Sequence, residues 1–244
     1  MDSLCTNVVV GEPATSTSPR DIFLAACSEI VARLSSRGYR YAKSGPHARK
    51  KSGVFTHEVS FQSSHNNAAG VCVKLWVHGK VLSKTLEAWR KSYPELHAID
   101  YVAGGQIGNL IPETNWCDWD LARESMRQAT VDDAVSAIET VALPYFAQFD
   151  DLDSLIHKSQ TTDIPSMTID RVIEFLMCFA DQGAAEVAAS NFLKRRPDLV
   201  SNYHRDFARY AERGLQYRRP SGYAAQLAFA SHLFKFGDLT GKGA

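Results

Sequence analysis

The most unusual short segment of the chain runs from Trp116 to Asp120 and alternates aromatic residues with acids, Trp-Cys-Asp-Trp-Asp. Tryptophan contributes strongly to protein interfaces, and carboxylates accept directed hydrogen bonds from Lys or Arg. A second acidic group, Asp150-Asp151-Leu152-Asp153, follows a predicted helix and is expected at the surface. The alternative for the first segment is packing of a long loop against a sheet. The residues expected to contact a partner are Trp116, Asp118, Trp119, Asp120, Asp150, Asp151 and Asp153.

The charges of the chain are balanced overall but unevenly distributed. Its 244 residues include 27 Lys and Arg and 27 Asp and Glu, a formal net charge of zero. Residues 128–181 hold 2 basic and 10 acidic residues, a charge of −8, whereas residues 182–244 hold 10 basic and 5 acidic residues, a charge of +5. The acidic block favours a protein partner with a basic surface. The alternative is that the acidic middle and the basic end neutralise each other.

Basic residues near the C-terminus suggest a nucleic-acid surface as another alternative. Lys and Arg neutralise phosphates, and the nearby Tyr203, Tyr210 and Tyr217 could stack on bases. Positive charge at the C-terminal end of a predicted helix explains part of this pattern more simply, and a net charge of zero argues against a protein devoted to nucleic acid. This alternative uses Lys194, Arg195, Arg196, Arg218 and Arg219.

The common catalytic and cofactor motifs are absent from the sequence. The glycines at 104, 105 and 108 resemble a phosphate loop, but they lack the Lys and Ser/Thr of that motif, which favours a turn or bulge. His57, Glu58 and His78 come closest to a metal-binding group. Strand alternation places His57 on one face and the other two residues on the opposite face, so we expect no metal site, cofactor or catalytic residue. The enzymatic alternative is a hydrolase or nuclease whose site forms only in three dimensions.

Cysteine spacing and hydropathy indicate a cytoplasmic protein. The five cysteines, at positions 5, 27, 72, 117 and 178, are odd in number and far apart, as is typical of separate reduced thiols. No apolar run approaches the roughly 18 to 20 residues that span a bilayer, and residues 1–20 lack the basic start and apolar core of a secretion signal. We therefore expect no membrane partner.

The elements that must position these residues change type along the chain. Ser18, Pro19 and Gly38 predict a helix over about 19–37, because Ser caps helix starts, Pro suits the first turn and Gly ends helices. Residues 55–62 and 71–77 alternate apolar and polar side chains and predict two strands joined by the polar segment 63–70. Aligning their apolar faces places Val59 opposite Val73, Phe61 opposite Val71 and Glu58 opposite Lys74. Further strands are predicted over 39–43 and 99–110, and a short helix over 82–89.

The second half of the chain is predicted to be helical. An apolar stripe over 130–149 indicates a helix capped by Thr130 and interrupted at Pro144. A polar, Pro-containing segment over 158–166 is the candidate domain boundary, and helices are predicted over 167–181, 184–196, 198–213 and 221–236. The fold class is therefore α+β, an antiparallel sheet with covering helices followed by a C-terminal helical bundle. The expected organisation is a flexible leader over 1–17, an α+β domain over 18–157 and a helical region over 167–244.

Four short patterns resemble an uncharacterised bacterial α+β domain family of unknown function. They are Gly38-Tyr39, the strand Val59-Ser60-Phe61-Gln62-Ser63, the strand 73–77 and the stretch from Gly108-Asn109-Leu110 to Trp116. The resemblance covers about residues 20–155 and implies no catalytic residue. Such families are sometimes found in toxin-neutralising or phage-conflict settings. The resemblance favours a small interaction module. Together with the lack of catalytic motifs, the −8 block and the segment from Trp116 to Asp120, it predicts a cytosolic protein-binding module, such as an immunity-like inhibitor of a bacterial protein toxin.

Overall fold

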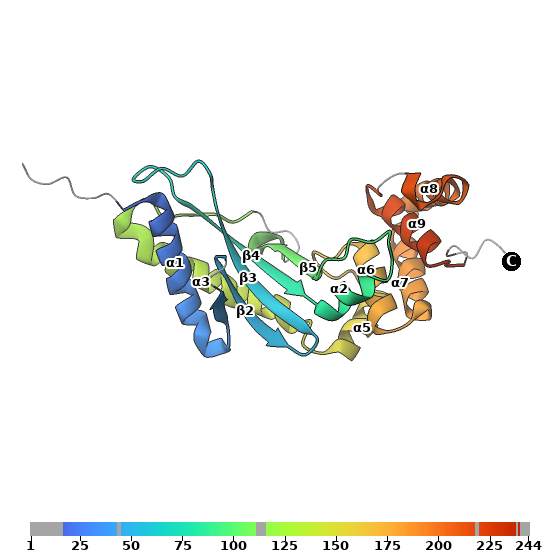
Figure 1. The fold of residues 1–244 in the computed structure, drawn as a ribbon, viewed down its shortest axis with the longest axis horizontal. Helices are drawn as coiled ribbons and strands as arrows, with labels where there is room; N and C mark the ends of the chain where they lie inside the picture. The colour runs from blue at the N-terminus through green and yellow to red at the C-terminus, as the bar shows by residue number, and fades with distance from the viewer. Residues whose placement is uncertain (1–16, 43–44, 111–115, 218–219, 238, 240–244) are drawn as a thin grey trace, which may run out of the picture.

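The computed structural model describes residues 17–42, 45–110, 116–217, 220–237 and 239, and it confirms the α+β class. An antiparallel sheet crosses the middle of the molecule, with neighbouring strands in the order β1-β2-β3-β4-β5 (Figure 1). These strands are β1 (Arg40–Ala42), β2 (His47–Ser52), β3 (Phe55–Ser63), β4 (Lys74–Leu82) and β5 (Tyr101–Gln106). The short strand β6 (Trp119–Asp120) pairs with the beginning of β4. Of the expected leader over 1–17, only residue 17 lies within the described residues.

Helices lie at both ends of the sheet and make the molecule elongated (Figure 1). At one end are α1 (Pro19–Leu34) and α3 (Arg127–Ala137), and α4 (Leu143–Ala147) continues from α3 beneath the apolar face. The short α2 (Lys84–Arg90) packs on the helices at the other end. Those helices are α5 (Leu152–Thr161), α6 (Ile169–Phe179), α7 (Gln182–Arg195), α8 (Val200–Arg213) and α9 (Tyr223–Leu233).

The N-terminal helix forms as its sequence predicts. The Ser18 hydroxyl oxygen accepts a hydrogen bond from the Asp21 N–H at 3.2 Å, which satisfies one of the free amides at the helix start. A 3₁₀ turn over Ser35–Arg37 extends α1 and ends at Gly38, whose φ of +86° lies in the region that glycine adopts readily. The buried side chains of α1 then cover the sheet beside α3.

The helix predicted over 130–149 differs in its start and in its middle. It begins at Arg127 instead of Thr130, whose hydroxyl donates to the Met126 carbonyl from inside the first turn. A π-helical stretch over Ile138–Ala142 separates α3 from α4. Pro144 has no N–H to donate and its ring crowds the preceding turn, so the wider π turn just before it accommodates the proline. The predicted interruption at Pro144 is confirmed.

The predicted pairing of the two central strands is wrong by six residues. Val59 lies opposite Gly79 instead of Val73, Phe61 opposite Val77 instead of Val71, and Glu58 opposite Lys80 instead of Lys74. An even shift leaves every side chain on its expected face, so alternation alone could not distinguish the two registers. The observed register places Gly79 where Leu110 and Phe146 pack: a Cβ there would lie 2.8 Å from Leu110 Cδ1.

Strand β2 and helix α5 were not predicted. The basic run Arg49-Lys50-Lys51 lies in β2, which pairs with both β1 and β3. Helix α5 includes part of the segment expected to be a boundary loop, and Asp151 caps it by accepting from the Ser154 N–H at 3.0 Å. Both segments are rich in polar residues, and their structure depends on contacts with distant parts of the chain.

The sheet and the helical region share one hydrophobic core. The Phe55 ring of β3 lies 6.0 Å from the Phe149 ring, 6.4 Å from the Phe175 ring and 5.8 Å from the Phe179 ring, measured between centroids. Phe175 and Phe179 belong to α6, and the buried apolar cluster continues from α1 through the sheet into α9. Burial of apolar surface therefore holds residues 18–157 and the helical region together.

Candidate functional site

The sheet has one apolar face and one face lined with polar side chains. On β3, Phe55, His57 and Val59 point into the core, whereas Glu58 and Ser60 point the opposite way, as alternation requires. Strand pairing brings residues of the polar face into rows. One row consists of His47, Ser60, His78 and Gln106, and the next consists of Arg49, Glu58, Lys80 and Gly104.

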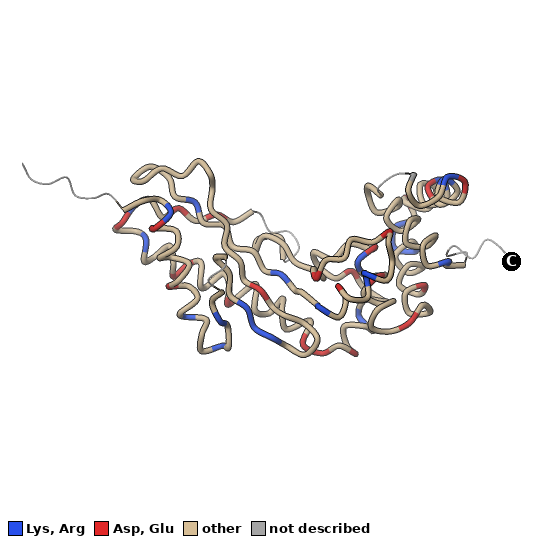
Figure 2. Tube along the Cα trace, viewed as in Figure 1, with Lys and Arg blue, Asp and Glu red and all other residues tan. Residues whose placement is uncertain are grey.

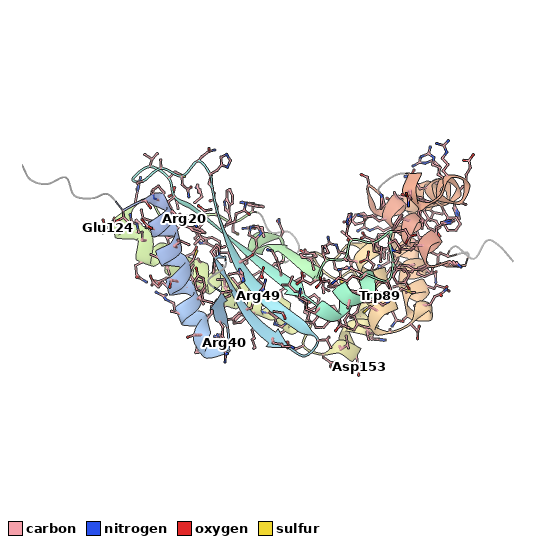
Figure 3. The ribbon with its side chains drawn as sticks, in the orientation of Figure 1. Arg20, Arg40, Arg49, Trp89, Glu124 and Asp153 are labelled. Atoms are coloured by element: carbon pink, nitrogen blue, oxygen red, sulfur yellow. The ribbon has the colours of Figure 1, made fainter. Side chains whose placement is uncertain are left out.

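The charged row is an internal ion network. Glu58 is buried, and its carboxylate lies 2.6 Å from the Arg49 guanidinium and 3.3 Å from Lys80 Nζ. Figure 2 shows basic and acidic positions along the central strands, and Figure 3 labels Arg49 there. Because a buried carboxylate needs charged partners to offset the loss of hydration, the network stabilises the sheet, and each carboxylate oxygen of Glu58 contacts a basic side chain.

His78, a member of the first row, belongs to a cluster of three aromatic side chains. The cluster consists of Trp76, His78 and Trp116, and we call it the Trp116 patch. The Trp116 ring meets the Trp76 and His78 rings edge to face, with centroids 5.9 and 6.1 Å apart. Trp116 is 54% exposed, although large aromatic side chains are usually buried. Beneath it, Trp76 Nε1 and His78 Nε2 are buried and have no hydrogen-bond partner among the described residues. The patch therefore combines an exposed aromatic ring with polar groups that still need partners.

Backbone and side-chain hydrogen bonds hold the segment that carries Trp116. Gln106 donates from Nε2 to the Cys117 carbonyl and accepts from the Gly108 N–H. Trp119 is buried, and its indole Nε1 donates to Asp133 at 2.7 Å. Asp120 accepts from the backbone N–H groups of Val73 and Ala122, each at 3.0 Å.

The acids of this segment are engaged within the protein. Lys74 Nζ lies 3.2 Å from the Asp118 carboxylate and 3.8 Å from that of Asp120. Burial opposes ionisation of Asp120, but its backbone hydrogen bonds and Lys74 outweigh that effect and lower its pKa. Of the residues expected to contact a partner here, Trp116, Asp118 and Asp120 are exposed and Trp119 is buried. Trp119 and Asp120 also anchor the segment to β4.

The second acidic group lies at the other end of the sheet. Asp150 accepts from the Ser52 hydroxyl at 2.6 Å, Asp151 caps α5, and Asp153 is exposed (Figure 3). Ser52 ends β2 beside the start of β3, whereas the Trp116 segment joins the sheet beside the end of β3. At roughly 3.3 Å per residue, the length of β3 separates the groups by about 25 Å. The structure does not bring the two expected partner-contacting segments together.

The described C-terminal basic residues, Lys194 to Arg196, differ in their contacts. Lys194 is exposed, whereas Arg195 donates to the Thr161 carbonyl at 3.0 Å and to Asp163 at 2.7 Å. The Arg196 guanidinium lies 5.8 Å from the Phe192 ring centroid and 5.7 Å from that of Tyr223. Arg218 and Arg219 lie outside the described residues.

The described residues contain no recognisable catalytic or metal-binding arrangement. Among them, no three His, Cys, Asp or Glu side chains are placed to hold a metal ion. Cys27, Cys72, Cys117 and Cys178 form no disulfide with one another, and burial raises the pKa of the Cys178 thiol to about 11. In the part of the chain that is described, no helix is long and apolar enough to cross a bilayer.

Comparison with known proteins concerns the part of the chain that carries the sheet. Residues 30–148, from within α1 to the end of α4, match a family model described as a domain of unknown function, DUF4304. This stretch is a DUF4304 domain. The match confirms the resemblance to an uncharacterised family. No curated protein and no solved structure matches the chain.

The DUF4304 domain holds the whole polar face and the Trp116 patch, whereas α5 to α9 follow it. The sequence identified Trp116 and His78 individually but missed His47 and Trp76 as their neighbours. The alternation of apolar and polar residues predicts which face of the sheet a strand residue lies on. Only the strand pairing shows which residues of that face are neighbours. The signal that could have found them is the concentration of His and Trp on the polar positions of β2 and β4.

Burial of three histidines predicts destabilisation by mild acid. Loss of hydration lowers the pKa of His47, His57 and His78. Below about pH 6.5 the unfolded chain takes up protons that the folded protein does not, so the free energy of unfolding should fall as the pH decreases through this range. Urea denaturation at pH 7.5 and 5.5 measures the change.

His57 gives a variant for this test because it stacks on Phe146 with ring centroids 4.9 Å apart. Replacement by the similarly shaped phenylalanine, His57→Phe, should reduce the difference in stability between the two pH values. The exposed His65 provides the control, since His65→Gln should leave that difference unchanged. Equal wild-type stability at both pH values would contradict the prediction.

Proposed function

We propose that this chain is a non-catalytic protein-binding module that contacts its partner through the Trp116 patch. The observation that carries the proposal is the exposed Trp116 ring above two buried nitrogens that have no partner among the described residues. Leaving a buried donor unsatisfied costs about 1–3 kcal/mol. Both nitrogens are covered in the free protein, so a partner recovers this energy only if the side chains above them move aside and it supplies an acceptor. Aromatic residues in such positions are the usual centres of binding energy at interfaces.

The chemistry of the patch suggests what the partner presents. Burial lowers the pKa of His78, so its imidazole is neutral at pH 7, and the Trp76 indole is a donor only. Lys74 offsets one of the two negative charges of Asp118 and Asp120, so the three groups together keep a charge of −1. A partner that inserts apolar side chains and backbone carbonyls therefore fits the patch, and its affinity should depend only weakly on salt.

The expectation of a basic partner stays a prediction. Asp150 and Asp153, the acids that favour such a partner, are about the length of β3 away from Trp116. The narrower form of the proposal, an immunity-like inhibitor of a bacterial protein toxin in the cytoplasm, derives from the family resemblance in the sequence. A toxin contacting this module would need to span both ends of the sheet to use all of the predicted residues.

Replacing Trp116 should abolish most of the binding. We expect Trp116→Ala to weaken the partner by about 30-fold or more, the effect of losing about 2 kcal/mol at an interface centre. The partner is first obtained by copurification from the native cell, and its affinity is then measured with purified proteins by calorimetry. Tyr41→Ala is the matched control, because Tyr41 is an aromatic residue, 38% exposed, on the edge strand β1.

The same purification distinguishes the alternatives. A stoichiometric protein whose affinity falls with Trp116→Ala but not with Tyr41→Ala supports the proposal. Equal affinity of wild type and Trp116→Ala contradicts the assigned surface. Copurified DNA or RNA that is lost when Lys194, Arg195 and Arg196 are replaced would favour the nucleic-acid alternative, and the absence of any partner would favour screening for hydrolase or nuclease activity.

A further inference from the structure

A second site with different chemistry lies where the sheet meets the helical region. A cavity of about 570 Å³, which we call the junction cavity, opens between β5, the segment 162–168 and helices α5 to α7. Cavities of roughly 300 to 1,000 Å³ are typical of small-molecule sites. The lining residues that matter for its chemistry are Tyr101, Ser159, Asp163, Arg171, Arg195 and Arg196.

The junction cavity carries an excess of positive charge. Its described lining includes three arginines and one acid, Asp163. Arg195 and Arg196 both lie within ion-pair distance of that single carboxylate, at 2.7 and 3.8 Å. Arg171 forms no ion pair within 4 Å among the described residues, although its charge acts on the Glu174 carboxylate. Its guanidinium lies over the Tyr101 ring, 4.2 Å from the centroid. Arginine held flat in this way keeps its hydrogen-bond donors available to an anion.

One buried side-chain donor without a partner and the start of a helix also line this cavity. Ser159 of α5 lines the cavity at 3% exposure, and its hydroxyl has no hydrogen-bond partner among the described residues. Helix α6 begins at the cavity wall, where Thr168 makes no side-chain cap. The first backbone N–H groups of a helix have no acceptor within it and favour an anion. Asp170, an acid in this first turn, lines a neighbouring cavity, which Arg171 also lines.

We propose that the junction cavity binds a small phosphorylated metabolite. The phosphate group lies against Arg171, Ser159 and the start of α6, and the organic part extends toward the rings of Phe192 and Tyr223, which also line the cavity. Phosphate suits this site because several donors and an arginine converge on it, and phosphate accepts hydrogen bonds from several sides. The inference goes beyond the proposed partner binding, since it concerns other residues and a different class of ligand.

Inorganic phosphate and adenosine 5′-monophosphate are the probes for this site. Titration of the full chain with each, followed by ³¹P NMR and calorimetry, should show saturable binding, with the nucleotide binding more tightly because its organic part fills the cavity. Arg171→Gln should weaken both ligands about tenfold, since losing a charge-assisted hydrogen bond costs about 1.5–3 kcal/mol. Ser159→Ala should also weaken both ligands about tenfold, since a hydroxyl that donates to a phosphate anion makes a charge-assisted hydrogen bond.

Arg20→Gln is the matched control, because Arg20 is an exposed arginine on α1 at the far end of the molecule (Figure 3). It should leave both affinities unchanged, and circular dichroism should show that all variants fold. Absence of saturable phosphate binding would overturn the proposal. So would equal losses in Arg171→Gln and Arg20→Gln, or acetate binding as tightly as phosphate.

Discussion

Gly104→Ala is expected to destabilise the protein by about 3 kcal/mol or more, through combined backbone strain and overpacking. Gly104 adopts φ +130°, which side-chain-bearing residues rarely adopt. A Cβ at this position would lie 2.2 Å from the Gly79 carbonyl oxygen and 2.8 Å from Lys80 Cα. Both atoms belong to the backbone of β4, so β4 and β5 would have to separate. Urea denaturation followed by circular dichroism measures the loss.

The neighbouring glycine supplies the control. Gly105 has no positive φ, and a Cβ added to it would have Ser166 Oγ as its nearest neighbour, at an ordinary contact distance of 3.8 Å. Gly105→Ala should therefore change the free energy of unfolding by less than about 1 kcal/mol. Equal stability of Gly104→Ala and the wild type would show that β4 and β5 do not approach so closely. Because Gly104 also lines the junction cavity, the substitution should impair phosphate binding as well.

Arg90→Met is expected to cost about 3–5 kcal/mol, the usual loss when one partner of a buried ion pair is removed. Arg90 is only 2% exposed, and its Nη2 lies 2.6 Å from the Glu174 carboxylate. Its Nη1 donates to the carbonyls of Ile99 and Tyr101, each at 2.7 Å. One guanidinium therefore joins α2, α6 and the start of β5. Without it, a buried carboxylate and two carbonyls lose their donors.

The pH dependence of this variant tests the electrostatic explanation. Burial raises the pKa of Glu174, with Arg90 acting against that rise. Removing Arg90 should raise the pKa further, and a carboxyl whose pKa is raised on folding loses its stabilising contribution as the pH increases. The destabilisation in Arg90→Met should therefore be larger at pH 7.5 than at pH 5. The double variant Arg90→Met/Glu174→Gln should recover part of the loss at pH 7.5; no recovery would indicate that packing dominates.

The individual members of the candidate site were easier to predict than their arrangement. The types and spacing of residues 116–120 identified this segment as unusual, but they did not distinguish the exposed Trp116 from the buried Trp119. That difference arises because β6 pairs with the start of β4 and directs Trp119 toward α3. Nothing in the sequence marked Arg171 as a binding residue. Its proposed contact with phosphate depends on the packing of α6 against β5, which places its guanidinium over the Tyr101 ring.

Features that depend on neighbours in the chain were predictable: the Ser18 cap, the turn at Gly38, the four C-terminal helices and the two faces of the central strands. They depend on hydrogen bonds and side-chain periods within a few residues. The register of β3 with β4, the strand β2, the separation of the two acidic groups and the junction cavity depend on segments that meet across long loops. Several such pairings satisfy the same local pattern, and the packing of Gly79 against Leu110 and Phe146 selects one of them.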